Sequence, residues 1–348
     1  MVQKIALFNH NSGISKTTTT FNLGWMLAAK GKRVILVDTD PQCNLSRMVL
    51  DEARIEAIYD TGSNIKTGLA PAFEFQPKAI EAVDCIPIEG RDGLFLLPGH
   101  VGFSEYEVTL GIAQELSGSI QSLKNLPGSI ADLLEKTANK FNADYILIDM
   151  SPSLGAINQN LLMISDFFIV PTTADFFSVM AIGSLAKVLP KWYAWAKAAS
   201  SLQILKDATY PFPQVKLRFL GIIVQNFRII RGKETAAFEK WIQKIEQDVS
   251  SKLVPIMRQN NMMLPEQVYS EQGVDRSFCL TKISNFNSLI ALSQEHRTPI
   301  YDLTPQQLRQ TGVVLKKNQA KQAEFQKTFA DLADKIIGLT SAAYAVSA

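Results

Sequence analysis

Short apolar runs recur along the chain, and turn-forming residues bound each of them. Six of these runs have strand length, and they span residues 5–8, 34–37, 94–97, 145–148, 167–170 and 219–224. Their side chains are apolar throughout and do not alternate with polar ones, which is typical of strands covered by helices on both faces. Helix-length segments lie between the runs. The pattern therefore predicts an α/β fold with a doubly wound, mainly parallel sheet flanked by helices.

Helical spacing is clearest in two segments. Within residues 17–30, Phe21, Trp25 and Ala28 recur at helical intervals, and Gly31 follows as a predicted helix end. Near the end of the chain, intervals of four and three residues place five apolar side chains on one helix face, namely Phe325, Phe329, Leu332, Ile336 and Leu339. Because no interdomain linker is visible, we predict one domain over residues 1–304 and a helical extension over 305–348 that packs on it.

Residues 55–92 show no clear hydrophobic period, because six glycines and prolines interrupt them. Glycine and proline are the residues that most often end helices and strands. We therefore predict a loop-rich excursion over this segment.

The charges nearly balance, with 35 basic and 33 acidic residues and a formal net charge of +2. Any affinity for nucleic acid must therefore come from local clusters of basic side chains. Two segments are enriched in them: residues 206–244 hold eight basic and three acidic residues, and residues 309–335 hold six and three. These clusters predict contacts with DNA phosphates that do not depend on base sequence, and an ordinary solvated surface is the alternative.

The cysteines indicate a reducing compartment. The chain has three, Cys43, Cys85 and Cys279, which are far apart in the sequence and form neither a disulfide framework nor a CxxC metal site. No signal peptide is recognisable, and no apolar run approaches the roughly 18 residues of a membrane span. We therefore expect a cytoplasmic protein.

A polar loop joins the first predicted strand directly to the first predicted helix. Backbone N–H groups at a helix N-terminus attract anions, a lysine there can neutralise the β- and γ-phosphates, and the next hydroxyl can bind Mg²⁺. Lys16 and Thr17 occupy those two positions. The strict pattern G-x-x-x-x-G-K followed by Ser or Thr is not met, because His10 and Ser15 replace its glycines. A phosphate loop is predicted, and an ordinary polar turn is the alternative.

From this loop onward, the chain resembles the ParA/MinD family of deviant Walker ATPases. In that family the loop reads KGGVGKTT and the second strand reads VLLVDxDPQ, and the corresponding segments here are NSGISKTTTTFNLGWMLAAKGKRV and ILVDTDPQCNLS. Asp38, Asp40, Pro41, Gln42 and Asn44 stand in the family register. Further matches are LFLLPGH at 94–100, ADYILIDMSPSLG at 143–155, SDFFIVPTTADFFSVMAIGSL at 165–185 and FLGIIVQNF at 219–227. The resemblance spans most of the chain and implies a P-loop NTPase fold for residues 1–304.

The resemblance also implies ATP and Mg²⁺ as cofactors and assigns their contacts. Lys16 and Asp40 are the implied catalytic residues, with Lys16 on the phosphates and Asp40 orienting the attacking water. Thr17, Asp38 and Asp149 are the implied metal-site residues. The implied nucleotide contacts are Ser12, Gly13, Ile14, Ser15, Lys16, Thr17, Thr18, Asn226, Asn285 and Phe286. Phosphoryl transfer needs mainly positioning and charge neutralisation, which these residue types supply.

Asn11 is the main departure from the family, because it stands where the family has its signature lysine. In the family that lysine crosses an ATP-sandwich homodimer and neutralises charge on the partner's phosphates. An asparagine can donate a hydrogen bond but carries no charge. The substitution predicts weak hydrolysis, unless another basic residue supplies the charge.

Two functions therefore stay open. One is a DNA-associated partition or positioning ATPase, associated with the nucleoid, which works with a ParB-like or cargo adaptor protein. The other is a nucleotide-binding regulatory subunit with little or no ATPase activity. A metabolic or redox member of the superfold is less favoured, because no cysteine pair is present and DPQ at 40–42 points to the ParA branch. Membrane binding is not expected, since the C-terminal sequence GLTSAAYAVSA lacks a basic face.

Overall fold

A central eight-stranded sheet organises the computed structural model, which describes residues 2–116, 121–227, 229–230, 233–234, 236–286 and 288–347. The strands are β1 (Gln3–Leu7), β2 (Val34–Asp38), β3 (Ile86–Pro87), β4 (Leu94–Leu97), β5 (Tyr145–Asp149), β6 (Phe167–Thr173), β7 (Arg218–Phe227) and β10 (Cys279–Ser284). They lie in the order β10-β7-β6-β1-β5-β2-β4-β3, and only β3 pairs in an antiparallel manner among these described strands. A separate short hairpin joins β8 (Ile229–Ile230) and β9 (Lys233–Glu234).

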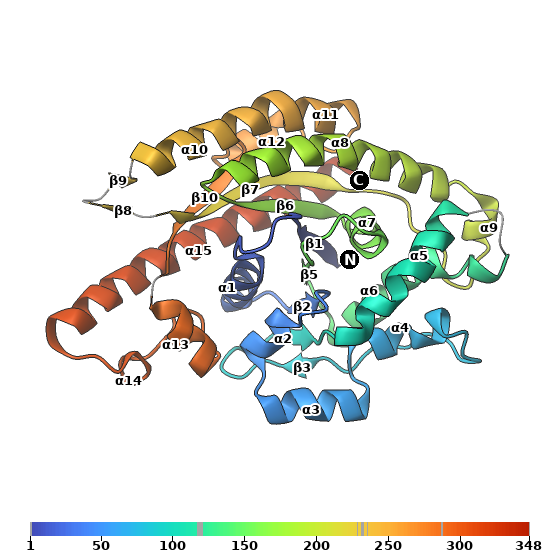
Figure 1. Cartoon of the computed structure of the whole chain (residues 1–348), viewed down its shortest axis with the longest axis horizontal. Coiled ribbons are helices and arrows are strands. Elements are labelled where there is room, and N and C mark those ends of the chain that lie inside the picture. Colours follow the sequence, from blue (N-terminus) through green and yellow to red (C-terminus); the bar gives the residue numbers. More distant parts are fainter. Residues whose placement is uncertain are drawn as a thin grey trace.

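Helices fill the connections between the strands (Figure 1). Up to β6 they are α1 (Lys16–Ala29), α2 (Asn44–Val49), α3 (Glu52–Thr61), α4 (Ile65–Phe73), α5 (Tyr106–Glu115), α6 (Leu126–Phe141) and α7 (Ala156–Met163). After β6 they are α8 (Phe176–Ala199), α9 (Gln203–Lys206), α10 (Ala236–Asp248), α11 (Val254–Gln259), α12 (Glu266–Glu271), α13 (Leu289–His296), α14 (Pro305–Leu308) and α15 (Gly312–Ser347).

Two helix layers cover the sheet. The connection through α1 leads from β1 toward β2, and the connection through α7 leads from β5 to β6 on the other side of β1. Right-handed crossovers therefore place α1 and α7 on opposite faces. α15 packs on α1 and β10, whereas α5, α6 and α8 pack on α7 and its neighbours. This arrangement confirms the predicted doubly wound fold.

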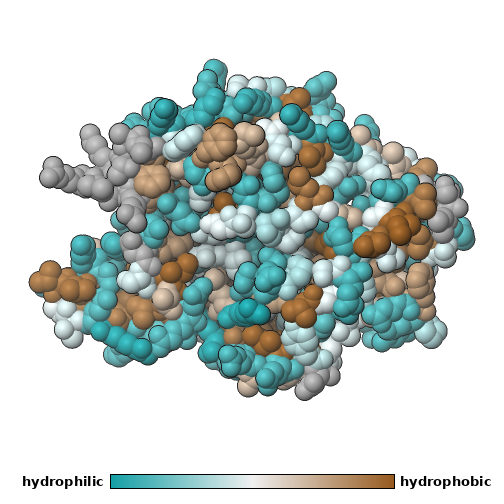
Figure 2. All heavy atoms as spheres, viewed as in Figure 1, coloured by the Kyte–Doolittle hydropathy of each residue, from teal (hydrophilic) through white to brown (hydrophobic). Residues whose placement is uncertain are grey.

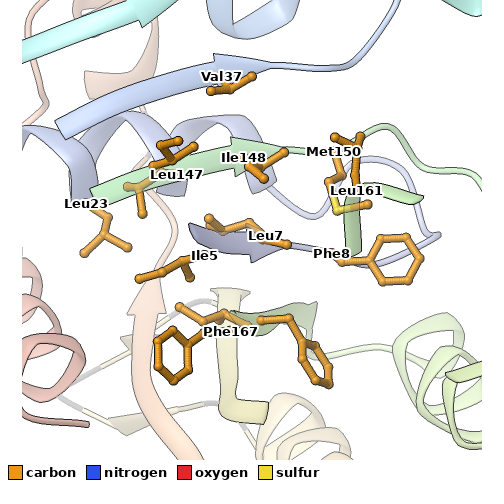
Figure 3. Packing of buried hydrophobic residues seen from close by; sticks show 14 of the residues in the cluster. Ile5, Leu7, Phe8, Leu23, Val37, Leu147, Ile148, Met150, Leu161 and Phe167 are labelled. Carbon is orange, nitrogen blue, oxygen red and sulfur yellow. The ribbon is translucent and has the colours of Figure 1, made fainter. Parts of the chain in front are cut away.

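The central strands are buried in the core. Leu7, Val37 and Ile148 lie on the adjacent strands β1, β2 and β5, and no part of their side chains is exposed (Figure 3). Leu23 of α1 and Leu161 of α7 are equally buried. Strands that are covered on both faces can be apolar at every position, so this packing explains the continuous apolar runs in the sequence.

All six predicted strands are present, and α1 ends as expected, because Gly31 follows its last turn with a φ of +80°. The loop-rich prediction for residues 55–92 is wrong over α3 and α4. The side chains of Asp51 and Asn64 accept hydrogen bonds from Arg54 N and Thr67 N, so each helix has a capped N-terminus. The glycines and prolines interrupt the hydrophobic period of this segment, so the sequence pattern did not predict these two capped helices.

α15 confirms the predicted C-terminal helix. Its five predicted apolar side chains, Phe325, Phe329, Leu332, Ile336 and Leu339, are all buried in the common core. Polar side chains add contacts, since Thr340 Oγ1 lies 2.9 Å from the hydroxyl of Tyr145 on β5. α15 thus packs on the sheet domain, while the boundary between residues 304 and 305 stays a prediction.

The surface is mixed in character. Apolar side chains gather over α5 and near the beginning of α15 (Figure 2), where Val108, Ile112, Val313 and Val314 are exposed. Among the described residues, no helix is long and apolar enough to span a membrane.

Phe329→Ala tests whether α15 is part of the core. We expect the free energy of unfolding to fall by about 3–5 kcal/mol, because a fully buried phenyl ring is replaced by a cavity. Denaturant titration measures the change. Val313→Ala on the same helix removes an exposed side chain and should change the unfolding free energy by roughly 0.5 kcal/mol or less. Equal effects of the two substitutions would contradict the packing of α15.

Candidate functional site

A cavity of about 670 Å³ lies at the carboxyl ends of the central strands. Its described lining comes from the loop after β1, the start of α1, the connection from β2 to α2, α2 itself, the loop after β5, and α13. The lining residues are Ser12, Gly13, Ile14, Ser15, Lys16, Thr17, Thr18, Asp40, Gln42, Asn44, Arg47, Met48, Pro152 and Gln294. The connections after β1 and β5 leave in opposite directions here, and ligands of open α/β sheets bind at such switch points.

The loop after β1 is held in an uncommon conformation. Gly13 has a φ of +71° and Ser15, directly before α1, has a φ of +56°. A left-handed backbone costs a non-glycine residue roughly 1–2 kcal/mol. Asn226 Nδ2 donates to Ser15 Oγ at 2.9 Å, and Gln225 Nε2 donates to the carbonyl oxygen of Ile14 at 3.1 Å. The end of β7 therefore fixes the loop from one side.

Lys16 folds back over the same loop. Its buried Nζ donates to the carbonyl oxygens of Asn9 at 2.9 Å and Asn11 at 3.0 Å. Burial lowers the pKa of Lys16, and the carboxylates of Asp149 and Asp40 act in the opposite direction. The ammonium group thus lies between the loop carbonyls and the acidic residues of the site.

Two buried aspartates lie next to each other beneath the cavity. Asp38 ends β2 and Asp149 ends β5, and the two residues are partners in the parallel register. Burial raises the pKa of Asp38 to about 6. Burial and the neighbouring Asp38 raise the pKa of Asp149 to about 8, while the Thr17 hydroxyl and Lys16 oppose this shift. A pair of like charges in this position favours any ligand that brings positive charge.

The two aspartates differ in their hydrogen bonds. Asp38 Oδ2 accepts from Ser46 N at 2.8 Å and from Ser46 Oγ at 2.7 Å, so it fixes the first turn of α2. Asp149 Oδ1 has a long contact, 3.5 Å from Thr20 Oγ1, the Thr17 hydroxyl also acts on this carboxylate, and its Oδ2 is buried without a close hydrogen-bond partner in the described part of the chain. The open carboxylate oxygen of Asp149, close to the Thr17 hydroxyl, fits the oxygen ligands that Mg²⁺ and its water shell require.

The described residues do not by themselves supply all the ligands of a metal ion. Among the described residues, no group of three or more His, Cys, Asp and Glu side chains is arranged to hold a metal ion. Mg²⁺ usually keeps several waters and is held by one or two carboxylates together with substrate phosphates. The side chains of Asp149 and Thr17 therefore fit a Mg²⁺ that arrives with a nucleotide.

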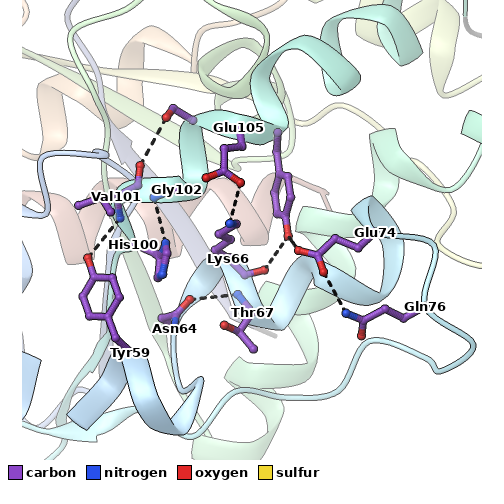
Figure 4. Close-up of polar contacts among 12 residues, drawn as sticks. Tyr59, Asn64, Lys66, Thr67, Glu74, Gln76, His100, Val101, Gly102 and Glu105 are labelled. Atoms are coloured by element: carbon purple, nitrogen blue, oxygen red, sulfur yellow. Dashed lines mark hydrogen bonds and ion pairs between the residues drawn. The ribbon is translucent and has the colours of Figure 1, made fainter. Parts of the chain in front are cut away.

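The segment after β4 contacts the serine that binds Asp38. Gly99 N donates to Ser46 Oγ at 3.0 Å, which extends the hydrogen bonds of Asp38 to this segment. Figure 4 shows the contacts that hold the next residues: Val101 N donates to the Tyr59 hydroxyl, and the Lys66 ammonium pairs with Glu105 at 2.7 Å. These contacts link α2, α3 and α4 to the segment after β4, and α2 in turn holds Asp38 through Ser46.

The structure brings together most of the predicted site residues. Ser12, Gly13, Ile14, Ser15, Lys16, Thr17, Thr18 and Asp40 line the cavity, and Asp38 and Asp149 lie beneath it. Asn226, Asn285 and Phe286 are not among its described lining residues. Asn226 contacts Ser15, and the Asn285 backbone N donates to Phe227. Phe286 is 3% exposed and packs edge-to-face on Phe325, so α15 holds its ring in the core.

Sequence reasoning missed several residues of the site. Gln225 was not predicted, although it is buried and holds both Ile14 and Thr19 of the loop region. A polar residue directly after the apolar run 219–224 was the available signal. Arg47 and Gln294 also line the cavity, and their contribution depends on how α2 and α13 pack. Asn11 is half-buried and is not among the described lining residues.

Comparison with known proteins identifies the family. A family model described as an AAA domain matches residues 2–204, which is more than half of the chain. The chain belongs to the ParA/MinD-like family. It is 30% identical over 183 residues to the sporulation initiation inhibitor protein Soj of Bacillus subtilis, a match that covers 52% of this chain and 62% of Soj.

Other ParA proteins agree with this membership. The chain is 29% identical over 189 residues to the chromosome partitioning protein ParA of Caulobacter vibrioides, covering 54% of this chain and 62% of that protein. The chain thus spans about six-tenths of the length of these curated ParA-like relatives. The structure of pNOB8 ParA bound to nonspecific DNA has the same fold, with a TM-score of 0.56, 20% identity and coverage of 98% of this chain and 99% of that one.

Asp149→Asn tests the electrostatic interpretation of this site. The pKa of Asp149 is raised from 3.8 to about 8 in the folded protein, so the folded state holds the proton more tightly than the unfolded state. Stability should therefore fall as the pH rises through this window. Asn cannot ionise, so the variant should lose this fall and melt roughly 2 °C or more above wild type at pH 8 without nucleotide.

Melting curves at pH 5 and pH 8 measure the effect. Asp331→Asn is the control, because Asp331 is exposed on α15. An Asp149→Asn variant with the pH dependence of wild type would contradict a buried, titrating carboxylate.

Proposed function

We propose that this chain is a ParA-like ATP-binding protein, a DNA-associated partition or positioning ATPase that acts as an ATP-sandwich dimer. The observation that carries the proposal is that Lys16 and Thr17 line one cavity at the N-terminus of α1, and that both act on the buried Asp149. Backbone N–H groups and a lysine at a helix N-terminus attract phosphates. The buried carboxylates beneath them suit a nucleotide that carries a divalent cation.

In the proposed reaction, the loop of residues 12–15 and Lys16 hold the ATP phosphates. Thr17 and Asp149 would hold Mg²⁺, and Asp38 fixes α2 through Ser46. Bound Mg²⁺ would neutralise phosphate charge during transfer. Asp40 is half-buried at the cavity, and its Oδ1 accepts from Gln42 N at 2.9 Å, which orients the carboxylate. We assign to Asp40 the positioning of the attacking water.

A homodimer fits the surface beside the cavity. Phe176, Phe177 and Met180 begin α8 directly after β6, the neighbour of β1, and they are 53%, 71% and 58% exposed. Leu154 follows β5 on the other side of β1 and is 41% exposed. An apolar rim around a charged cavity suits a partner that closes over a bound ligand. We propose a second copy of this chain as that partner.

Nonspecific DNA binding is proposed from the N-terminal half of α15. Lys316, Lys317 and Lys327 are exposed and Lys321 is half-buried, and within the described residues none of the four forms an ion pair. The proposal is supported by pNOB8 ParA, a protein of this fold whose structure is bound to nonspecific DNA. Of the basic cluster in 206–244, the side chains of residues 228–237 lie outside the described part of the chain.

The second candidate is a nucleotide-binding regulatory subunit with little or no ATPase activity. Asn11 favours it, because an uncharged amide occupies the position where the family resemblance places a lysine. We propose slow hydrolysis on this ground, in a cytoplasmic protein that associates with the nucleoid and with a ParB-like or cargo adaptor. Steady-state phosphate release with and without DNA separates the two candidates.

Lys16→Ala tests ATP binding. Wild type should gain thermal stability from ATP and Mg²⁺, and the variant should lose most of this gain, because the charge that faces the phosphates is removed. Thermal shift at several ATP concentrations is the measurement. Lys187→Ala removes an exposed charge on α8 and should respond like wild type. An unchanged response in Lys16→Ala would contradict the phosphate-loop assignment.

Replacing Lys316, Lys317 and Lys321 by Ala tests DNA binding. We expect weaker binding to duplexes of any sequence, and a shallower dependence of log K on log salt, by about 0.9 for each phosphate that is no longer neutralised. Fluorescence anisotropy at two salt concentrations, with and without ATP, measures both quantities. Alanine at Lys187, Lys191 and Lys197, all exposed on α8, removes the same charge and is the matched control. Equal losses in both triple variants would show that α15 is not the DNA-binding surface.

A further inference from the structure

The cavity contains a second cationic side chain besides Lys16. Among its described lining residues, Lys16 and Arg47 are the two that carry positive charge. Lys16 Nζ is already within hydrogen-bond distance of two loop carbonyls. A triphosphate with one divalent cation still carries net negative charge, so a second cation in the same cavity has an obvious electrostatic use.

α2 presents Arg47 to the cavity. Asn44, Arg47 and Met48 are spaced i, i+3 and i+4, which places them on one helix face, and all three line the cavity. The position of this face is fixed, because the adjacent Ser46 donates to Asp38 through both its backbone N and its Oγ. The backbone that carries Arg47 is therefore anchored to the end of β2.

Arg47 is exposed, and within the described residues its guanidinium makes neither a hydrogen bond nor an ion pair. Arg54, one helix further on, provides the contrast, because its guanidinium pairs with Glu89. An arginine on a cavity wall with all its donors free is ready to bind an anion in a bidentate manner.

The cavity wall that carries Arg47 also carries Asp40. Asp40 lies on the same segment, and its charge acts on both Lys16 and Asp149. The segment from Asp40 to Arg47 and the loop with Lys16 therefore line one cavity.

We propose that Arg47 binds the terminal phosphate of the nucleotide from within the same chain and so distinguishes ATP from ADP. The proposal rests on the proposed function, and it assigns to Arg47 part of the charge that Asn11 does not carry. Arg47 would recognise the phosphate that is present in ATP and absent from ADP, whereas Lys16 and the loop bind the phosphates that both nucleotides share.

Arg47→Gln tests the assignment in titrations with Mg²⁺ and either ADP or an ATP analogue that cannot be hydrolysed. We expect the Kd of the ATP analogue to rise about tenfold or more, the effect of losing one hydrogen bond to a charged group. The Kd of ADP should change by less than about threefold. Arg47→Lys keeps the charge but loses the planar fork, so it should retain part of the preference for the ATP analogue.

Two controls keep the outcome clear. Arg54→Gln removes an exposed arginine outside the cavity lining and should bind both nucleotides like wild type. The melting temperature without nucleotide should be unchanged in Arg47→Gln, because the guanidinium bonds to no other described residue of the free protein. Wild-type affinity for the ATP analogue in Arg47→Gln, or equal losses for both nucleotides, would overturn the proposal. A wild-type protein that binds neither nucleotide would instead contradict the proposed function itself.

Discussion

The carboxylates of Asp38 and Asp149 lie next to each other at the ends of β2 and β5, and both are buried. Two like charges at this spacing are costly in a low-dielectric interior unless protons, cations or hydrogen bonds compensate them. Ser46 compensates Asp38 by tying α2 to β2, and Lys16 lies on the loop side of Asp149. The positions of α2, of the loop after β1 and of the cavity wall all depend on how this acidic pair is satisfied.

Much of the fold follows from the sequence, because strands buried on both faces are apolar at every position. β2 and β5 show this directly. β10 was missed because only Leu280 and Ile283 of this edge strand are buried, which leaves too short a pattern. α3 and α4 were missed because glycines and prolines interrupt the segment, while the caps at Asp51 and Asn64 that form these helices are local hydrogen bonds.

The candidate site also contains residues that the sequence could place and residues that it could not. The loop after β1 could be placed from its residues and the aspartates at strand ends from the family resemblance, and they meet because parallel strands end at one edge of the sheet. The position of Phe286 could not, since it depends on Phe325 of a helix far along the chain. Arg47 could not be predicted either. A six-residue helix is too short to show a hydrophobic period, and the orientation of this helix comes from the contact between Ser46 and Asp38. Contacts between distant segments therefore limit what the sequence alone can tell.

The hydrogen bond between Asn226 and Ser15 has a consequence for sequence variation. Both residues have positive φ values, 59° and 56°, so two strained backbones support each other through one side-chain contact. A glycine at position 15 would adopt the same conformation without strain and would need no partner. Asn226 would then no longer be needed to hold the residue at position 15. The two positions are therefore constrained jointly, although 211 residues separate them in the chain.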